Sequence, residues 1–233
     1  MNENEQIDVV IPVYNEEKGL PEFITRLTQL DLNIHPVFVD NASTDGSLQI
    51  MRQVPGATVI THARNEGYGA SLRDGIRATT TEKILIIDAD CEYPPEALPA
   101  LAAELDQHSV VYASRFLDPV RQTPMPFLKK AGNVIISGLY NFLFNQQTTD
   151  LYTGSKGFQR AAIYSLPMQR NGFEHVLEIA TRLARRGYTI KEIHVSFRPR
   201  QTGRAKMKHI PETMKYLYLL LYYFITIPFE RRR

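Results

Sequence analysis

The stretch Ile84-Leu-Ile-Ile-Asp-Ala-Asp-Cys-Glu-Tyr-Pro-Pro-Glu96 decides the fold class of this chain. Its apolar start leads into carboxylates at every second position, Asp88, Asp90 and Glu92. Two prolines follow and stop a strand from continuing, because proline has no backbone N–H to donate. An ionised carboxylate inside a buried strand loses its hydration unless something compensates it. We therefore predict a buried strand over residues 84–87 that delivers the three carboxylates to its C-terminal end.

These carboxylates have two interpretations. Residues two apart in an extended chain point to the same side, so Asp88, Asp90 and Glu92 are able to converge on one ion. Oxygen ligands suit Mg²⁺ or Mn²⁺ rather than Zn²⁺, and the first interpretation is therefore a divalent metal site. The second interpretation is a solvated acidic turn.

Strand-like and helical patterns alternate along the chain, which is typical of an α/β fold with a mainly parallel sheet. The predicted strands are residues 7–14, 35–40, 57–61, 84–87, 110–114 and 190–198. The predicted helices are residues 15–30, 47–53, 67–78, 96–107, 128–144 and 173–186. Residues 150–154 are predicted to form a turn.

Polar side chains follow three of the predicted strands. Residues 14–16 follow the first strand, Asp40 and Asn41 follow the second, and the carboxylates of residues 88–92 follow the fourth. In sheets of this kind the ligand binds beyond the C-terminal ends of the strands. We expect these side chains to meet at one edge of the sheet, and this convergence favours the metal site over the solvated turn.

Length and composition describe one large domain, or a domain with a small appendage, in 233 residues. Cys91 is the only cysteine, so no internal disulfide is possible, and we interpret it as a small packing residue. The net charge of +2 is unevenly placed, because residues 198–233 carry nine basic and two acidic side chains. We expect this basic part to meet phosphates or a membrane surface, and we do not expect a nucleic acid partner.

The C-terminal part contains an uninterrupted run of apolar, aromatic or threonine residues, 216–227, and three arginines follow at 231–233. A helix of this length reaches roughly 20 Å and is too short to cross the ~30 Å hydrocarbon core of a bilayer. One interpretation is a helix that lies in the interface of an anionic membrane leaflet. The other is a helix packed on the core of its own domain or on a partner.

Six motifs stand in the order seen in family 2 glycosyltransferases. They are Val10-Ile-Pro-Val-Tyr-Asn-Glu16, Val39-Asp40-Asn-Ala-Ser-Thr-Asp-Gly46, Arg64-Asn-Glu-Gly-Tyr-Gly69, Asp88-Ala-Asp90, Ser114-Arg115 and Arg200-Gln-Thr-Gly-Arg-Ala-Lys206. Over about residues 7–210 the chain most resembles the dolichol- or polyprenyl-phosphate mannosyltransferases and the bacterial polyprenyl-phosphate glucosyltransferases. The resemblance implies a GT-A domain, which we place at residues 1–210. The apolar run predicts a separate C-terminal helix over 211–233 that meets a membrane or a partner.

The resemblance also implies roles for individual residues. Asp90 and Glu92 would bind a Mg²⁺ or Mn²⁺ ion that bridges the donor diphosphate, and Asp90, Arg115 and Arg200 would be the catalytic residues. The implied donor-binding residues are Pro12, Tyr14, Glu16, Val39, Asp40, Asp88, Ala89, Asp90, Arg115, Arg200 and Lys206. Two positions depart from the usual pattern: Asn41 stands where a second Asp is usual, and Ala205 replaces a Ser.

Two kinds of acceptor would need different chemistry. A phosphate monoester has a second pKa of about 6 and is already dianionic near neutrality, so it needs cations rather than a base. Lys129 and Lys130 are candidates to guide such a phosphate. A sugar hydroxyl instead needs a general base, for which Glu174 and Glu178 are the candidates.

The function that the resemblance implies is metal-dependent, inverting transfer of mannose or glucose from a nucleotide sugar (GDP-mannose or UDP-glucose) to a polyprenyl phosphate. The N-terminus shows no signal-peptide pattern, so we expect a cytoplasmic protein attached peripherally to the cytoplasmic face of a membrane through residues 216–233. Two alternatives stay open. One is transfer to a saccharide in surface polysaccharide synthesis, and the other is a non-catalytic, nucleotide-sugar-binding membrane scaffold.

Overall fold

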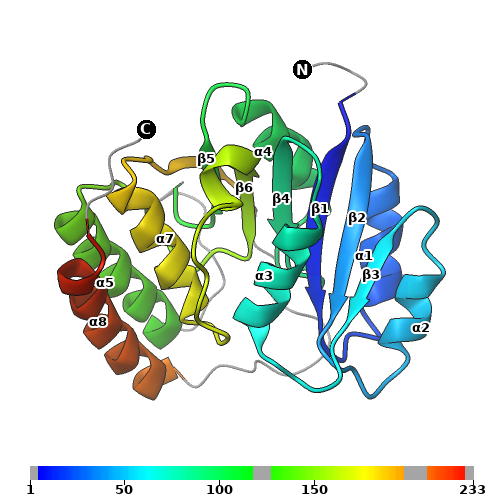
Figure 1. Ribbon diagram of the computed structural model, residues 1–233, viewed down its shortest axis with the longest axis horizontal. Helices are drawn as coiled ribbons and strands as arrows, with labels where there is room; N and C mark the ends of the chain where they lie inside the picture. Colours follow the sequence, from blue (N-terminus) through cyan, green and yellow to red (C-terminus); the bar gives the residue numbers. More distant parts are fainter. Residues whose placement is uncertain (1–4, 118–126, 197–208, 229–233) are drawn as a thin grey trace.

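The computed structural model describes residues 5–117, 127–196 and 209–228. Its centre is a seven-stranded sheet in the order β3-β2-β1-β4-β6-β5-β7 (Figure 1). The strands are β1 (Ile7–Val13), β2 (Ile34–Asp40), β3 (Thr58–Thr61), β4 (Lys83–Ile87), β5 (Val110–Ser114), β6 (Ser155–Gln159) and β7 (Lys191–His194). The helices are α1 (Leu20–Thr28), α2 (Ser47–Arg52), α3 (Tyr68–Ala78), the 3₁₀ turn η1 (Pro95–Ala97), α4 (Leu98–Glu104), α5 (Phe127–Phe144), α6 (Arg160–Ile163), α7 (His175–Arg185) and α8 (His209–Thr226).

The sheet is mainly parallel, as predicted, with one antiparallel strand in its middle. The pairs β1–β2, β1–β4, β2–β3 and β5–β7 are parallel. Strand β6 pairs antiparallel with both β4 and β5. It was not predicted, because its sequence Ser-Lys-Gly-Phe-Gln shows neither an apolar run nor a clear alternation.

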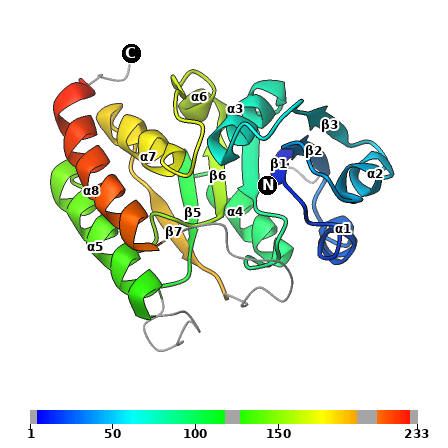
Figure 2. The same cartoon turned by 90° about the horizontal axis from the view of Figure 1, so that it is seen from below.

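Helices cover both faces of the sheet. Figure 2 shows α1 and α4 on one face and α3, α6 and α7 on the other. Alternate residues of β1 serve the two layers, since Val9 and Ile11 pack in the cluster with α1 and α4 while Val10 packs in the cluster with α3 and α7. Because helices bury both faces of the sheet, the central parallel strands have almost continuous apolar sequences.

The first helix begins later than predicted. Residues 15–30 were expected to be helical, but α1 starts at Leu20. Asn15 has a positive φ of 54°, which a right-handed helix cannot accommodate, and asparagine tolerates this conformation better than most residues. The residues between β1 and α1 therefore form a shaped loop at the C-terminal edge of the sheet.

The C-terminal helix α8 packs on its own domain along one side. Tyr216, Leu220 and Tyr223 are buried in a third core cluster with residues of α5 and α7. The opposite side of α8 is exposed, and it includes Tyr218 and Ile225. Within residues 5–117, 127–196 and 209–228, no helix is both long enough and apolar enough to span a bilayer.

A buried carboxylate ties together the N-terminal ends of β1, β2 and β4. Asp8 is fully buried and accepts hydrogen bonds from the backbone N–H of Thr80 (2.6 Å) and of Thr81 (2.9 Å). Its other oxygen lies 2.6 Å from Nδ1 of His35. Burial alone would raise the pKa of Asp8, but the hydrogen bonds from Thr81, His35 and Thr80 hold that pKa below its ordinary value.

We predict that Asp8→Asn lowers the free energy of unfolding at pH 7 by about 2–4 kcal/mol, because buried donors lose a charged acceptor. A carboxylate whose pKa is lowered by folding stabilises the fold above its unfolded value of about 3.9, and this contribution is lost as the pH falls. The difference between Asp8→Asn and the wild type in urea unfolding should therefore shrink in acid. Asp31→Asn, at an exposed position, is the matched control, and equal effects of the two substitutions would contradict the prediction.

Candidate functional site

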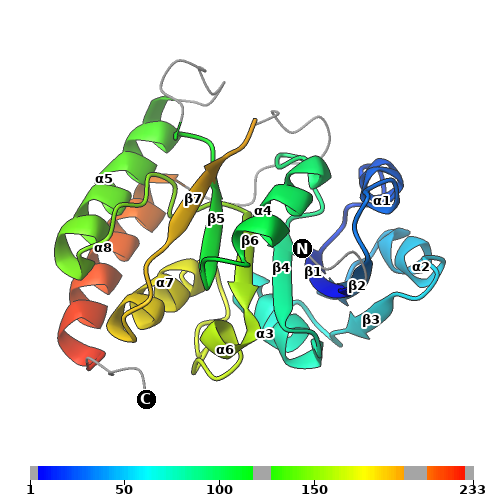
Figure 3. The ribbon, with the colours of Figure 1, turned by 90° about the horizontal axis from the view of Figure 1, so that it is seen from above.

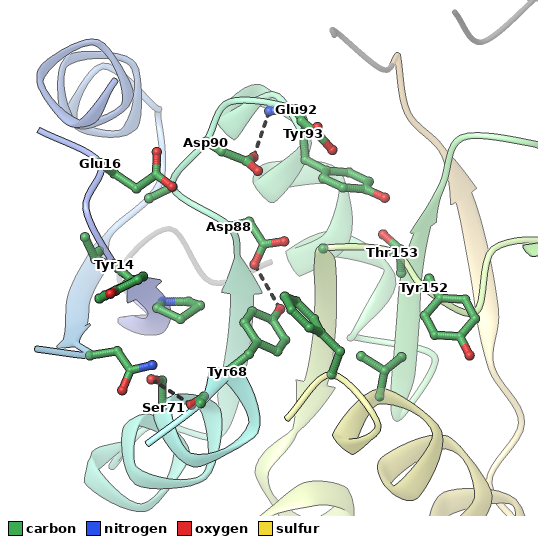
Figure 4. A pocket seen from close by; sticks show the side chains of 18 of the residues that line it. Tyr14, Glu16, Tyr68, Ser71, Asp88, Asp90, Glu92, Tyr93, Tyr152 and Thr153 are labelled. Carbon is green, nitrogen blue, oxygen red and sulfur yellow. Dashed lines mark hydrogen bonds between the residues drawn. The ribbon is translucent and has the colours of Figure 1, made fainter. Parts of the chain in front are cut away.

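A cavity of about 490 Å³ lies beyond the C-terminal ends of β1 and β4, where the sequence predicted a site. Figure 4 shows Tyr14 and Glu16 on one side of it, and Asp88, Asp90 and Glu92 at its centre. Its opposite side is formed by aromatic and small side chains. These include Tyr93, Tyr152, Thr153, Phe173 and Val176.

Most of the predicted site residues lie together. Eight of them line the cavity: Pro12, Tyr14, Glu16, Asp88, Ala89, Asp90, Glu92 and Arg115. Val39 and Asp40 are buried at the end of β2 and do not line it. Arg200 and Lys206 lie outside the described residues.

The predicted acceptor and base residues lie elsewhere. Lys130 is exposed on α5 and does not line the cavity. Lys129 belongs to α5, but its side chain is outside what the structure describes. Glu178 is buried and accepts hydrogen bonds from the backbone N–H of residues 169 and 170, while Glu174 lies 3.1 Å from Nζ of Lys215. Both glutamates therefore have structural partners on the α7 side of the cavity.

The loop after β1 is held by the loop after β2. The N–H of Asn15 donates to Oγ of Ser43 (3.0 Å), and Oδ1 of Asn15 accepts from the N–H of Thr44 (2.8 Å). The N–H of Glu16 donates to Oγ of Ser47 (2.9 Å). These bonds explain how the left-handed Asn15 is stabilised, and they place Tyr14 and Glu16 at the cavity.

Asn41, one of the two positions that depart from the family pattern, lines the cavity within an amide network. Its Oδ1 accepts from the N–H of Glu66 (2.8 Å) and lies 3.0 Å from Nδ1 of His62. Its Nδ2 donates to Oδ1 of Asn65 (3.0 Å). The N–H of Glu66 requires an acceptor, which fixes the orientation of this amide, and an aspartate could not make the bond to Asn65 in the same way.

The acidic end of β4 is a turn rather than an extended strand. The prediction that the three carboxylates alternate along an extended chain is wrong, because β4 ends at Ile87 and Cys91 has a positive φ of 57°. Asp88, Asp90 and Glu92 nevertheless line one cavity (Figure 4). Oδ1 of Asp90 accepts from the N–H of Glu92 (3.0 Å), which closes the turn.

Asp88 has a different environment from the other two carboxylates. Its Oδ1 accepts a hydrogen bond from the hydroxyl of Tyr68 (2.9 Å), and its N–H donates to the carbonyl oxygen of Gly154 (3.1 Å). Burial raises the pKa of Asp88, and the negative charge of Asp90 raises it further, while Lys156 and Tyr68 act in the opposite direction. Asp88 is thus held by Tyr68 and Gly154, with Asp90 and Lys156 as its charged neighbours.

Arg115 reaches the cavity in a fixed position. Its Nε and Nη2 donate to the two carboxylate oxygens of Asp150, at 2.7 and 2.8 Å, and its guanidinium lies 5.2 Å from the ring centre of Tyr93. Glu192 of β7 in turn accepts from the N–H of Thr149 (2.8 Å) and of Asp150 (3.0 Å). Glu192 therefore fixes the backbone at Thr149 and Asp150, and Asp150 in turn holds the guanidinium of Arg115.

Several residues of the site were not predicted. Asp150 and Tyr152 were assigned only to a turn, and nothing in that pattern shows that the carboxylate pairs with Arg115. Tyr68 and Phe173 stack with ring centres 5.2 Å apart and both line the cavity. Sequence order gives no sign of this stacking, because tertiary packing brings α3 to the start of α7.

Two glycines at the start of α3, Gly67 and Gly69, lie very close to the backbone of the loop before α7. A Cβ at Gly67 would lie 2.3 Å from the carbonyl oxygen of Asn171, and one at Gly69 would lie 2.4 Å from that of Arg170. The glycines therefore let α3 approach the loop before α7, which brings Tyr68 to Phe173.

A mainly parallel sheet with an acidic strand end and a cavity at its C-terminal edge is the arrangement expected for the GT-A class of glycosyltransferases. The model for "Glycosyl transferase family 2" matches residues 8–166, and the chain belongs to this family. The predicted fold and the predicted enzyme class are both confirmed.

Relatives and solved structures agree with this assignment. An uncharacterized glycosyltransferase of Mycobacterium tuberculosis (strain ATCC 25618 / H37Rv) is 30% identical over 86% of this chain and 89% of the relative. A dolichyl-phosphate hexose transferase of Haloferax volcanii is 28% identical over 87% of each chain. Glucosyl-3-phosphoglycerate synthase of Mycobacterium tuberculosis, crystallised with Mn²⁺, UDP and phosphoglyceric acid, has the same fold, with a TM-score of 0.72 and 20% identity over 95% of this chain and 79% of that chain.

We predict that Gly154→Ala lowers glycosyl transfer by about tenfold or more, because small misplacements at a reacting centre are costly. A Cβ at Gly154 would lie 2.2 Å from Oδ2 of Asp88, so this carboxylate would have to move. The measurement is the rate of nucleoside diphosphate release, with thermal unfolding as the check on the fold. Gly138→Ala on α5, where a Cβ meets nothing within 4 Å, is the control. Unchanged kinetics in Gly154→Ala would show that the position of Asp88 does not matter.

Proposed function

We propose that the chain transfers a hexose, mannose or glucose, from a nucleotide diphosphate sugar to a polyprenyl phosphate, with inversion at the anomeric carbon. The observation that carries the proposal is the cavity that joins the carboxylates of residues 88–92 to Tyr14 and Glu16 on one side and to Arg115 on the other. Relatives named dolichyl-phosphate hexose transferase and dolichol-phosphate mannosyltransferase support this choice of acceptor.

Asp90 and Glu92 would hold a divalent metal, Mg²⁺ or Mn²⁺. Within the described residues, no three His, Cys, Asp or Glu side chains are grouped to bind a metal by themselves. A pair of carboxylates beside a diphosphate suits these ions, which commonly take one or two protein carboxylates together with phosphate oxygens and water. When bound, the metal would neutralise charge that develops on the leaving diphosphate.

The protein's own residues would then orient the two substrates. Pro12 and Tyr14 would contact the nucleotide, and Asp88 would contact the sugar. Arg115, which Asp150 holds in place, would bind the donor phosphates. Arg200, Lys206, Lys129 and Lys130 keep their proposed roles as phosphate-binding cations. Because a phosphate dianion needs no general base, the structural engagement of Glu174 and Glu178 supports a phosphate acceptor over a sugar hydroxyl.

The proposed place of reaction is the cytoplasmic face of a membrane, where the lipid acceptor would be embedded. Residues 216–233 would meet the membrane surface or a small membrane protein there.

We predict that Asp90→Ala lowers turnover by about three orders of magnitude, since a catalytic metal contributes several kcal/mol of transition-state stabilisation. The increase of the melting temperature on adding Mn²⁺ with a nucleoside diphosphate should be lost as well. Glu82→Ala, at an exposed position before β4, is the control. Normal turnover of a folded Asp90→Ala variant would exclude a metal role for this residue.

The proposed function is tested in two steps. Thermal unfolding with Mn²⁺ across GDP- and UDP-sugars should reveal a donor, because a ligand that binds only the folded state raises the melting temperature. That donor is then incubated with a polyprenyl phosphate, a soluble saccharide and phosphoglyceric acid, and the products are separated. We expect a labelled lipid product only. Transfer to a soluble acceptor but not to the lipid, or donor binding without any transfer, would overturn the proposal.

A further inference from the structure

The outer sides of α5 and α8 form one exposed apolar surface. The two helices lie side by side at the edge of the molecule, beyond α7 (Figures 2 and 3). Nine of the twelve large apolar side chains that are exposed in the described residues belong to these two helices. The α5–α8 face consists of Val134, Ile135 and Phe142 of α5 and Met214, Tyr218, Leu221, Tyr222, Phe224 and Ile225 of α8.

This face lacks the charges expected on a helix surface in water. Residues 131–144 and 216–228 contain no Asp, Glu, Lys or Arg. Phe142 is 84% exposed and Ile225 is 81% exposed. A contiguous apolar surface of this kind marks an interaction site rather than ordinary scattered exposure.

The two helices run in the same direction, so their ends coincide. A Cβ at Gly132 would lie 3.1 Å from Oγ1 of Thr213 near the start of both helices, and the rings of Phe144 and Phe224 are 5.8 Å apart near their ends. Lys130, which is exposed, lies at the shared starting end. Arg185 lies at the other end, 4.9 Å from the ring centre of Phe224.

Further basic residues are close to both ends in the sequence. Lys129 precedes Lys130, and three arginines, 231–233, follow within seven residues of the end of α8. An apolar stripe with exposed tyrosines and with cations at its ends complements the interface of an anionic lipid leaflet.

The buried side of α8 reaches the wall of the cavity. Tyr216 of α8 packs against Tyr152, which lines the cavity, with ring centres 5.2 Å apart. Lys215 bonds Glu174, the neighbour of the cavity residue Phe173. Helix α8 therefore lies between the α5–α8 face and the end of the cavity that Tyr152 and Phe173 form.

We propose that the α5–α8 face docks on the surface of an anionic lipid bilayer and that α5 contributes to this contact together with α8. We choose an anionic bilayer as the partner because basic residues lie at both ends of the face. Its link to a lipid acceptor rests on the proposed function. The contribution of α5 separates this proposal from attachment through the C-terminal residues alone.

Vesicle flotation of the full chain tests the proposal without any sugar donor. The probes are vesicles of phosphatidylcholine alone and vesicles that also contain phosphatidylglycerol. Phe142→Ser on α5 and Ile225→Ser on α8 each remove a largely exposed apolar side chain. Each should lower the partition coefficient by about tenfold or more, as expected for one large apolar side chain buried in lipid. Deleting residues 216–233 is a poorer test, because it removes Tyr216, Leu220 and Tyr223 from the core.

Tyr164→Ser is the matched control, because Tyr164 is 43% exposed next to α6, away from the α5–α8 face. Its vesicle binding should equal that of the wild type, and circular dichroism and urea unfolding confirm that all three variants are folded. Binding of Phe142→Ser at the wild-type level would overturn the contribution of α5. Equal binding of the wild type to neutral and anionic vesicles would overturn the choice of an anionic surface.

Three further outcomes separate this proposal from its rivals and from the proposed function. A concentration-dependent dimer in light scattering that both face variants abolish, with no vesicle binding by the wild type, would assign the face to a second copy of the chain and overturn the proposal. Vesicle binding without sugar transfer would contradict the proposed function alone. Transfer to a water-soluble short-chain prenyl phosphate without vesicle binding would contradict the docking surface alone.

Discussion

The antiparallel pairing of β6 with β4 is the constraint on which the arrangement of the cavity depends. Ser155 pairs with Ile87 at the end of β4, and the N–H of Asp88 continues the pairing by donating to the carbonyl oxygen of Gly154. This register brings the residues before β6, Tyr152 and Thr153, to the acidic strand end. Strand β6 also joins β4 to β5, so the four strands β3-β2-β1-β4 and the β5–β7 pair belong to one sheet.

The same pairing places a buried cation behind the acidic end. Lys156 of β6 is buried and interacts electrostatically with both Asp88 and Asp150. Burial lowers the pKa of Lys156, while the charges of the two carboxylates oppose that change. Asp150 is shared with Arg115, so the carboxylates of the cavity and of the β5 loop belong to one group of coupled charges. Isolated charges at this depth would be strongly destabilising, which explains why they occur as a connected set.

Sequence reasoning predicted the parts of this structure that are determined locally. Strands β1, β2 and β4 are nearly continuous apolar runs because both faces of the sheet are covered. Most of the polar residues after them meet at the cavity as expected, but Asp40 does not line it. Strand β6 was not found, because its polar and glycine residues are selected by neighbours far away in sequence. The pairing of Arg115 with Asp150 and the stacking of Tyr68 on Phe173 also join residues far apart in sequence, so they could not be predicted from local patterns.

The C-terminal run shows how a correct pattern can support two interpretations at once. Twelve apolar residues in a row looked like either a membrane anchor or a core helix, and α8 buries one side on α5 and α7 while its other side stays exposed. The periodicity of an all-apolar run cannot separate the two sides, because both are apolar. The sequence of α5 gave no indication of an exposed apolar surface. Its Val134, Ile135 and Phe142 form such a surface only together with the neighbouring α8. The two helices therefore acquire a joint outer face from packing, which neither segment indicates alone.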